Sequence, residues 1–266
     1  MSHPRVLVVQ HQPSCPVALF GDWLAQAGVR LEIRRADRAD GLAGPDLRAG
    51  SYDGLLVLGG AVSALDDEAS PWLPAVRDLI AQAARLRVPT LGICLGHQLA
   101  AQALGGAVAA NPFGPTIGLR QVDWEPEIIF DPLVRDIAGE DRAVHWNEDV
   151  VTELPPGGLR LASTLDGQVQ AARHAPTVWG VQFHPEADAE VVRGWAASHR
   201  AALAGRAGEE GTGDGDTDEE RVVAPVVEAA AELSATWRRL AEAFAALVRG
   251  RRAAAESTGV PGPGER

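Results

Sequence analysis

Lysine is absent from the sequence, and all 24 basic residues are arginine. This absence excludes Schiff-base catalysis and a Walker-A phosphate-binding loop, because both need a lysine amine. The 36 acidic residues bring the net charge to −12, which argues against binding of nucleic acid or of an anionic membrane by bulk attraction. We therefore expect no nucleic-acid partner and no membrane partner.

Cysteine and long apolar runs are also scarce. The two cysteines, Cys15 and Cys94, cannot build a disulfide framework. No stretch approaches the roughly 18 consecutive apolar residues of a membrane span, and residues 1–10 lack the pattern of a secretory signal peptide. No group of residues has the spacing of a metal site. We expect a cytoplasmic protein that uses no metal and no organic cofactor.

The first part of the chain alternates short apolar runs with helical patterns. Strands are expected at residues 6–9, 29–33, 55–58 and 90–93, and helices at 17–27, 72–83 and 95–104. This alternation predicts an α/β fold with an open, mostly parallel central sheet and helices on both faces. The next part has short strand candidates with few helices between them, at 117–124, 142–146, 159–164, 169–173 and 178–183, and then a helix at 188–203. It predicts a small mixed-sheet extension, so that residues 1–204 form one domain.

The composition changes sharply after residue 204. Residues 205–220 are acidic and rich in glycine, which predicts a flexible linker. Within residues 221–252, apolar residues recur in alternating four- and three-residue steps, and this pattern predicts one amphipathic helix. Its apolar face is expected to pack on the domain, or alternatively on a second chain. It is expected to have no catalytic role, so its removal should leave hydrolysis largely intact. Residues 253–266 are predicted to be a disordered tail.

The strongest chemical signal surrounds Cys94. In the segment VPTLGICLGHQLA, a buried strand runs into Cys94, glycines flank it as G-x-C-x-G, and a helix follows. This is the cysteine counterpart of the nucleophile elbow, a tight strand-to-helix turn that projects its side chain. The helix N-terminus favours a thiolate, and the N–H group of Leu95 points to where an oxyanion would develop. Cys94 is therefore the candidate nucleophile.

A second segment, GVQFHPE, supplies a candidate base. An apolar strand ends in His184, and the following proline holds His184 in extended geometry. Residues two apart then lie on the same side, so Glu186 can orient the His184 imidazole. A Cys–His–carboxylate set at two strand ends is typical of an activated nucleophile. His97 is nearer in sequence, but its helix carries it back along the sheet, so a packing role is expected for it.

A third strand, at residues 55–58, runs into Gly59 and Gly60. Consecutive glycines present bare backbone N–H groups at the sheet edge, where one could act as a second oxyanion donor.

These motifs, in this order and separation, resemble the class I (triad) glutamine amidotransferase family over roughly residues 5–200, and within it the glutaminase domain of GMP synthase. The resemblance implies that Cys94 is the nucleophile, His184 the base and acid, and Glu186 the orienting carboxylate. It also implies that the N–H groups of Gly60 and Leu95 form the oxyanion hole. The implied substrate contacts are Gly59, Gln98, Trp146, Asn147 and Asp149, the last three in the segment WNEDVVTELP, which resembles one that contacts the α-amino and carboxylate groups of glutamine.

Two positions depart from the family pattern. Many members have Gly-Gly-Pro where this chain has Gly59-Gly60-Ala61, so that Ala61 keeps an N–H group that proline lacks. The substrate segment usually has a histidine where Asn147 stands. These departures concern the second oxyanion donor and the preference for glutamine, and they leave the three catalytic residues untouched.

Three functions fit this sequence. The first is cysteine-dependent hydrolysis of the glutamine side-chain amide, with ammonia delivered to a separate synthetase. The second is hydrolysis of another γ-glutamyl compound, as by a γ-glutamyl peptidase. The third is a catalytically quiet binding module that kept the fold. The complete set of Cys94, His184 and Glu186 argues against the third.

Overall fold

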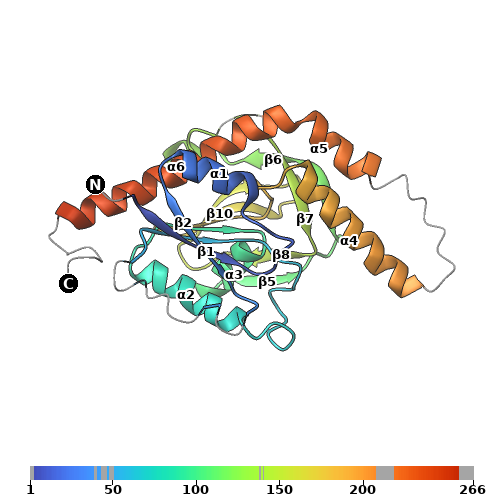
Figure 1. Cartoon of the computed structure of the whole chain (residues 1–266), viewed down its shortest axis with the longest axis horizontal. Helices are drawn as coiled ribbons and strands as arrows, with labels where there is room; N and C mark the ends of the chain where they lie inside the picture. The colour runs from blue at the N-terminus through green and yellow to red at the C-terminus, as the bar shows by residue number, and fades with distance from the viewer. Residues whose placement is uncertain are drawn as a thin grey trace.

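A computed structural model describes residues 3–38, 41–42, 47, 51–137, 139, 141–207 and 219–257 (Figure 1). Its centre is a nine-stranded sheet in the order β2-β1-β3-β4-β11-β10-β9-β6-β7. The parallel half consists of β2 (Arg30–Arg35), β1 (Arg5–Gln10), β3 (Gly54–Val57), β4 (Thr90–Ile93) and β11 (Val178–Val181). The antiparallel half consists of β10 (Val169–Ala175), β9 (Leu159–Ser163), β6 (Thr116–Trp124) and β7 (Asp141–Asn147).

Helices cover both faces of the sheet, because the central strands are apolar on both sides. Along β1, Val6 and Val8 pack into one core, whereas Leu7 and Val9 pack into the other. The first face carries α1 (Ala18–Gln26), α4 (Ala189–Ala207) and α6 (Ala230–Ser257), and the second carries α2 (Leu73–Arg85) and α3 (Leu95–Ala103) (Figure 1). The predicted α/β class is confirmed, with the mixed extension formed by the antiparallel half.

Three short elements of the middle segment were not among the predicted ones. The strands β5 (Ala107–Ala110) and β8 (Asp149–Glu153) pair as a separate two-stranded sheet, and a 3-10 helix, η2, spans Pro126–Phe130. Strand β5 is mostly alanine and only partly buried, and Val108 is its single β-branched residue, so its sequence lacks the composition and the alternation of an ordinary strand. The turn from β7 into β8 places residues 147–149 beside the N-terminal turns of α3.

The C-terminal segment is helical over a longer range than predicted. A π-helical turn at Glu219–Val223 leads into α5 (Ala224–Glu228) and then α6, which ends at Ser257 and not at residue 252. Helix α4 likewise reaches Ala207, past the predicted start of the linker at 205. Residues 208–218, the greater part of the predicted linker, and residues 258–266 lie outside the described residues. Within the described residues, no helix combines the length and the apolar character needed to cross a bilayer.

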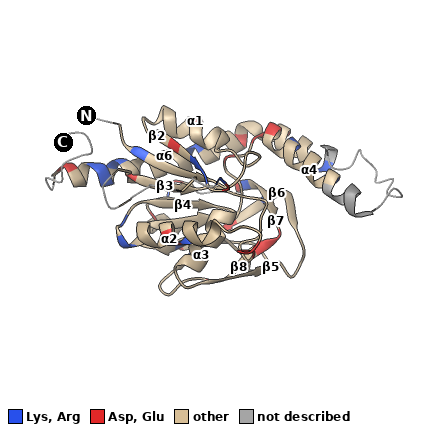
Figure 2. Ribbon diagram, turned by 60° about the horizontal axis from the view of Figure 1, so that its bottom comes forward, with Lys and Arg blue, Asp and Glu red and all other residues tan. Residues whose placement is uncertain are grey.

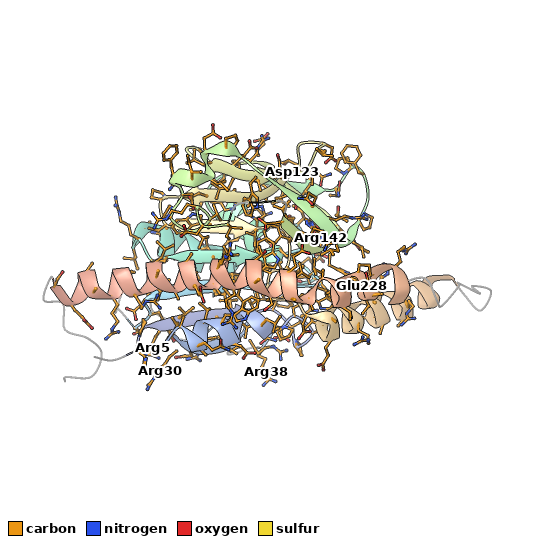
Figure 3. The ribbon with its side chains drawn as sticks, turned by 90° about the horizontal axis from the view of Figure 1, so that it is seen from above. Arg5, Arg30, Arg38, Asp123, Arg142 and Glu228 are labelled. Atoms are coloured by element: carbon orange, nitrogen blue, oxygen red, sulfur yellow. The ribbon has the colours of Figure 1, made fainter. Side chains whose placement is uncertain are left out.

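Helix α6 lies along the first face of the domain, across the sheet and beside α1 (Figure 3). The side chains of Trp237, Leu240 and Phe244 are almost completely buried in the core of that face. Charged side chains fix the two ends: Glu232 pairs with Arg142 at 2.6 Å, and Arg252 pairs with Asp53 at 3.2 Å. Figure 2 shows the basic C-terminal part of α6, where Arg249 and Arg251 also donate to backbone carbonyl groups of Ala27 and Tyr52. The helix is therefore part of the domain core.

Candidate active site

Cys94 stands at a sharp turn between β4 and α3. Its backbone has φ 50° and ψ −106°, a positive-φ conformation that is uncommon for a residue with a side chain. The flanking glycines are required by close packing: a Cβ atom on Gly92 would lie 2.4 Å from the Gly96 carbonyl, and one on Gly96 would lie 2.1 Å from the Val57 oxygen. The turn has the geometry of a nucleophile elbow and places the thiol at the carboxyl edge of the parallel strands.

His184 and Glu186 form a buried pair at the end of the neighbouring strand β11. The His184 Nδ1 atom lies 2.7 Å from Glu186 Oε1, and the backbone N–H group of His184 donates to the Val144 carbonyl at 2.8 Å. Burial by itself lowers the pKa of His184, but the charges of Glu186 and Cys94 outweigh it and raise the pKa to about 10. The imidazole is therefore protonated at neutral pH.

Gly59 brings the thiol and the imidazole together. A Cβ atom on Gly59 would lie 2.8 Å from His184 Cε1 and 3.6 Å from Cys94 Cβ, so glycine is the residue that lets both side chains approach this strand end. The Cys94 sulfur is contacted by the Gln182 side-chain amide at 3.6 Å and lies 3.8 Å from the Trp146 carbonyl oxygen. The contact from Gln182 is one that the sequence analysis missed, although Gln182 lies within the GVQFHPE segment.

Gly60 and Leu95, the two residues expected to donate to an oxyanion, lie next to each other. A Cβ atom on Gly60 would lie 2.7 Å from the Leu95 side chain, so these two residues are in direct proximity. Leu95 is the first residue of α3, where helix geometry leaves the N–H group without an intrahelical acceptor. The N–H group of Ala61 donates to the Gln12 side chain at 3.1 Å. Ala61, which stands where many relatives have proline, therefore adds an N–H donor. This donor is already bound to the Gln12 side chain.

A cavity of about 310 Å³ opens in front of Cys94. Gly60, Gln98, Trp146, Asn147, Asp149 and His184 line it together with Cys94. Gly59, Leu95 and Glu186 do not line it, but each lies directly behind a residue that does. The structure thus brings all the predicted site residues to one place.

The side of the cavity next to α3 is polar. Gln98 donates to the Asp149 carbonyl at 2.8 Å and to the Gln182 side chain at 3.2 Å. The Asp149 carboxylate accepts a hydrogen bond of 2.6 Å from Ser63, and Asn147 donates to the Asp149 carbonyl at 3.2 Å. The Asn147 Oδ1 atom is buried and has no hydrogen-bond partner among the described residues. This side therefore presents the Asp149 carboxylate to the cavity.

The side next to α4 is aromatic. The Trp195 ring lies 4.6 Å from the His184 ring and 5.8 Å from the Trp146 ring, measured between centroids, and the His199 ring lies 6.0 Å from that of Trp146. The Trp195 N–H group donates to the Ser14 carbonyl at 2.7 Å, which ties α4 to the loop after β1. Cys15 of this loop also lines the cavity, and burial, followed by the charges of Cys94 and Glu186, raises its pKa to about 12. Sequence analysis placed neither Ser14 and Cys15 nor Trp195 and His199 at the site.

Four further histidines are buried in the domain. His97 and His174 share a contact of 2.9 Å between ring nitrogens, and burial lowers the pKa of both. Burial lowers the pKa of His11 to about 4 and that of His145 to about 3. None of the four lines the cavity, which agrees with the packing role expected for His97.

The geometry defines a buried Cys–His–Glu site at the carboxyl edge of a parallel sheet. The sequence model of the class-I glutamine amidotransferase family matches residues 21–193. A glutamine-hydrolyzing GMP synthase of Synechococcus sp. (strain CC9311) is 38% identical over 184 residues, which are 66% of this chain and 33% of that protein. One of the subunits of a glutamine-hydrolyzing GMP synthase from Saccharolobus solfataricus is 42% identical over 102 residues, which are 38% of this chain and 52% of that protein.

Solved structures show the same fold. A glutamine amidotransferase from Thermotoga maritima has a TM-score of 0.78 at 22% identity, covering 92% of this chain and 99% of that one. A glutamine amidotransferase from Methylobacillus flagellatus has a TM-score of 0.74 at 28% identity, covering 94% of this chain and 96% of that one. The chain spans between a third and about half of the length of the curated relatives named above. Because the family model matches more than half of the chain, this protein belongs to the class-I glutamine amidotransferase family.

Proposed function

We propose that this protein hydrolyses the side-chain amide of glutamine through a Cys94 thioester and that the ammonia passes to a separate acceptor. The observation that carries the proposal is the buried 2.7 Å contact between His184 and Glu186 beside the elbow that holds Cys94. A thiol, a base and an orienting carboxylate in this arrangement favour an enzyme over a quiet binding module.

The charge state of His184 suggests how the reaction begins. With its pKa raised to about 10, His184 holds a proton at neutral pH. The Cys94 thiolate attacks the amide carbon, and the N–H groups of Gly60 and Leu95 stabilise the resulting oxyanion. His184 gives its proton to the leaving nitrogen as the C–N bond breaks. A water molecule, deprotonated by His184, then hydrolyses the C–S bond and releases glutamate and the thiol.

The polar side of the cavity fits the α-amino end of glutamine. We assign the ammonium group to the Asp149 carboxylate, which lines the cavity. Gln98 holds the Asp149 backbone in place, Trp146 and Gly59 shape the pocket, and the Asn147 amide takes the role that a histidine has in many relatives.

The ammonia acceptor would be a second polypeptide. The relative from Saccharolobus solfataricus is named as one of the subunits of a glutamine-hydrolyzing GMP synthase. We therefore propose a separate synthetase as partner. A free, buried thiol pair without a disulfide also fits a reducing, cytoplasmic compartment.

A second candidate function is hydrolysis of a larger γ-glutamyl amide. The aromatic side of the cavity, which begins at Trp195 beside His184, gives room on the leaving-group side that ammonia does not need. Such an enzyme would work without an acceptor protein.

Turnover and labelling test the proposal. Glutamate release from L-glutamine should be measured for the wild type and for Cys94→Ala, with and without candidate synthetases. We expect release from the wild type and none from Cys94→Ala. A γ-glutamyl-like electrophile should modify Cys94 and spare Cys15, because burial raises the pKa of Cys15 to about 12 and keeps it protonated. An adduct on Cys15 alone would refute the assignment of the nucleophile.

A further inference from the structure

The cavity extends from Cys94 to both faces of the sheet. Toward α3 it reaches Ser63, Gln98 and Asp149, which belong to the polar side described above. Toward α4 it reaches Trp195 and His199, on the face of the sheet that also carries α1 and α6 (Figure 1). We call this second region, lined by Ser14, Trp146, Trp195, Ser198 and His199, the α4 arm.

The position of His184 assigns a role to the α4 arm. The leaving nitrogen of the amide has to lie within hydrogen-bond reach of the imidazole that protonates it. The Trp195 ring lies 4.6 Å from that imidazole, so a substituent on the leaving nitrogen passes directly along Trp195. The polar side is occupied by the glutamyl end of the same substrate. The α4 arm is therefore the space into which an N-substituent extends.

The α4 arm and the cavity mouth are suited to a positive charge. Two tryptophans, Trp146 and Trp195, form the wall, and indole faces attract ammonium groups. Glu148, an exposed residue that lines the cavity, adds a carboxylate. No arginine is among the described residues that line the cavity. A carboxylate on the leaving group would meet Glu148 with no arginine among the described lining residues to pair with.

We infer that this site also hydrolyses γ-glutamyl amides of cationic alkyl amines, such as a diamine, with the N-substituent in the α4 arm and its free ammonium group near Glu148. The inference rests on the proposed thioester chemistry. The amide C–N bond breaks as the C–S bond to Cys94 forms, the leaving amine takes the proton of His184, and water then releases glutamate. No oxidant, reductant or second substrate is needed.

A set of four amides tests the inference. They are L-glutamine, γ-glutamyl-1,4-diaminobutane, its neutral counterpart γ-glutamyl-butylamine, and the anionic γ-glutamyl-4-aminobutyrate. Glutamate release gives kcat/KM for each, and the shift in thermal midpoint of Cys94→Ala protein reports binding where turnover is slow. The cationic amide should be the best of the three substituted amides in both measurements, and the anionic amide the poorest.

Two matched variants test whether Glu148 is the carboxylate that attracts the free ammonium group. Glu148→Gln should lower kcat/KM for the diamine amide about two- to fivefold relative to L-glutamine, the range expected for one exposed carboxylate. Glu153→Gln removes an exposed carboxylate of the neighbouring strand β8 that does not line the cavity, and should leave this ratio unchanged. Ser198→Arg, which adds a cation to the α4 arm, should reverse the preference toward the anionic amide.

The outcomes separate the two proposals. Turnover of L-glutamine with neither binding nor turnover of any substituted amide would overturn the α4-arm inference and leave the proposed function standing. A preference for the anionic amide, or equal use of all three, would also overturn it. Absence of binding and turnover for all four compounds would refute both.

Discussion

At the scale of single residues, the proposed chemistry depends on how Glu186 sets the charge of His184. Burial lowers the pKa of His184, and the negative charges of Glu186 and Cys94 raise it to about 10. A protonated imidazole is the acid that the leaving nitrogen needs. The activity should therefore fall as the pH rises through the pKa of His184, because the proton is then lost to solvent.

Glu186→Gln tests this dependence. The substitution removes one of the two charges that raise the pKa of His184 and leaves the burial that lowers it, so the pKa should fall. We expect the alkaline limb of kcat/KM for L-glutamine, measured from about pH 6 to about pH 11, to move to lower pH than in the wild type. The rate at neutral pH should fall less than in His184→Asn, which should lose about 10³-fold or more. An unchanged alkaline limb would contradict the assignment of Glu186 as the orienting carboxylate.

Gly59→Ala tests the packing between thiol and imidazole. The added Cβ atom would lie 2.8 Å from His184 Cε1, so the imidazole has to move. We expect a loss of roughly 100-fold in kcat/KM, the size associated with small misplacements of reacting groups, with little change in thermal midpoint. The control is Gly194→Ala on α4, where the added atom meets nothing within 4 Å. Equal activity in both variants would contradict the placement of Gly59.

At the scale of elements, α6 contributes to the core that supports the site. Trp237 is 1% exposed, and its ring lies 4.6 Å from that of Phe183, the residue directly before His184. The expectation that removal of the C-terminal segment would leave hydrolysis largely intact does not fit this packing, because removal would expose the core beside β11.

Trp237→Ala should therefore destabilise the domain. Loss of a buried indole of this kind costs about 3–5 kcal/mol, counting both the lost burial and the cavity. Urea unfolding should show a free energy of unfolding lower by that amount, whereas Glu242→Ala, on the exposed face of the same helix, should change it by less than about 0.5 kcal/mol. A similar free energy of unfolding for the two variants would mean that the packing of α6 does not stabilise the core.

The sequence allowed some of these elements to be predicted and not others. Gly92, Gly96 and the proline after His184 constrain the backbone locally, so the two strand ends could be recognised without any tertiary information. Trp195 and His199 could not, because which face of α4 meets the cavity is decided by the docking of α4 against Trp146. The amphipathic pattern at 221–252 predicted a helix, but the surface that receives it is assembled from distant segments.

At the scale of the whole molecule, four buried histidines make stability depend on pH. Burial lowers the pKa of His11 to about 4, of His145 to about 3 and of His174 to about 4, and burial and the charge of His174 lower the pKa of His97 well below its usual value. In the unfolded chain each would titrate near 6.5. Between pH 6.5 and about pH 4 the unfolded state therefore binds more protons than the folded state.

The free energy of unfolding should consequently be independent of these histidines above pH 6.5 and should fall as the pH decreases below it. Each histidine contributes a slope of at most about 1.4 kcal/mol per pH unit, and protonation of carboxylates adds to the loss below about pH 5. His184 acts in the opposite direction, because its pKa is raised to about 10: its contribution to stability is present below pH 6.5 and is lost as the pH rises toward 10.

Urea midpoints from about pH 5 to about pH 10 should therefore pass through a maximum. His174→Gln should reduce the slope on the acid side, and His184→Gln should reduce it on the alkaline side. A wild-type midpoint that stays constant from pH 7 to pH 5 would contradict the neutral state assigned to the four buried rings.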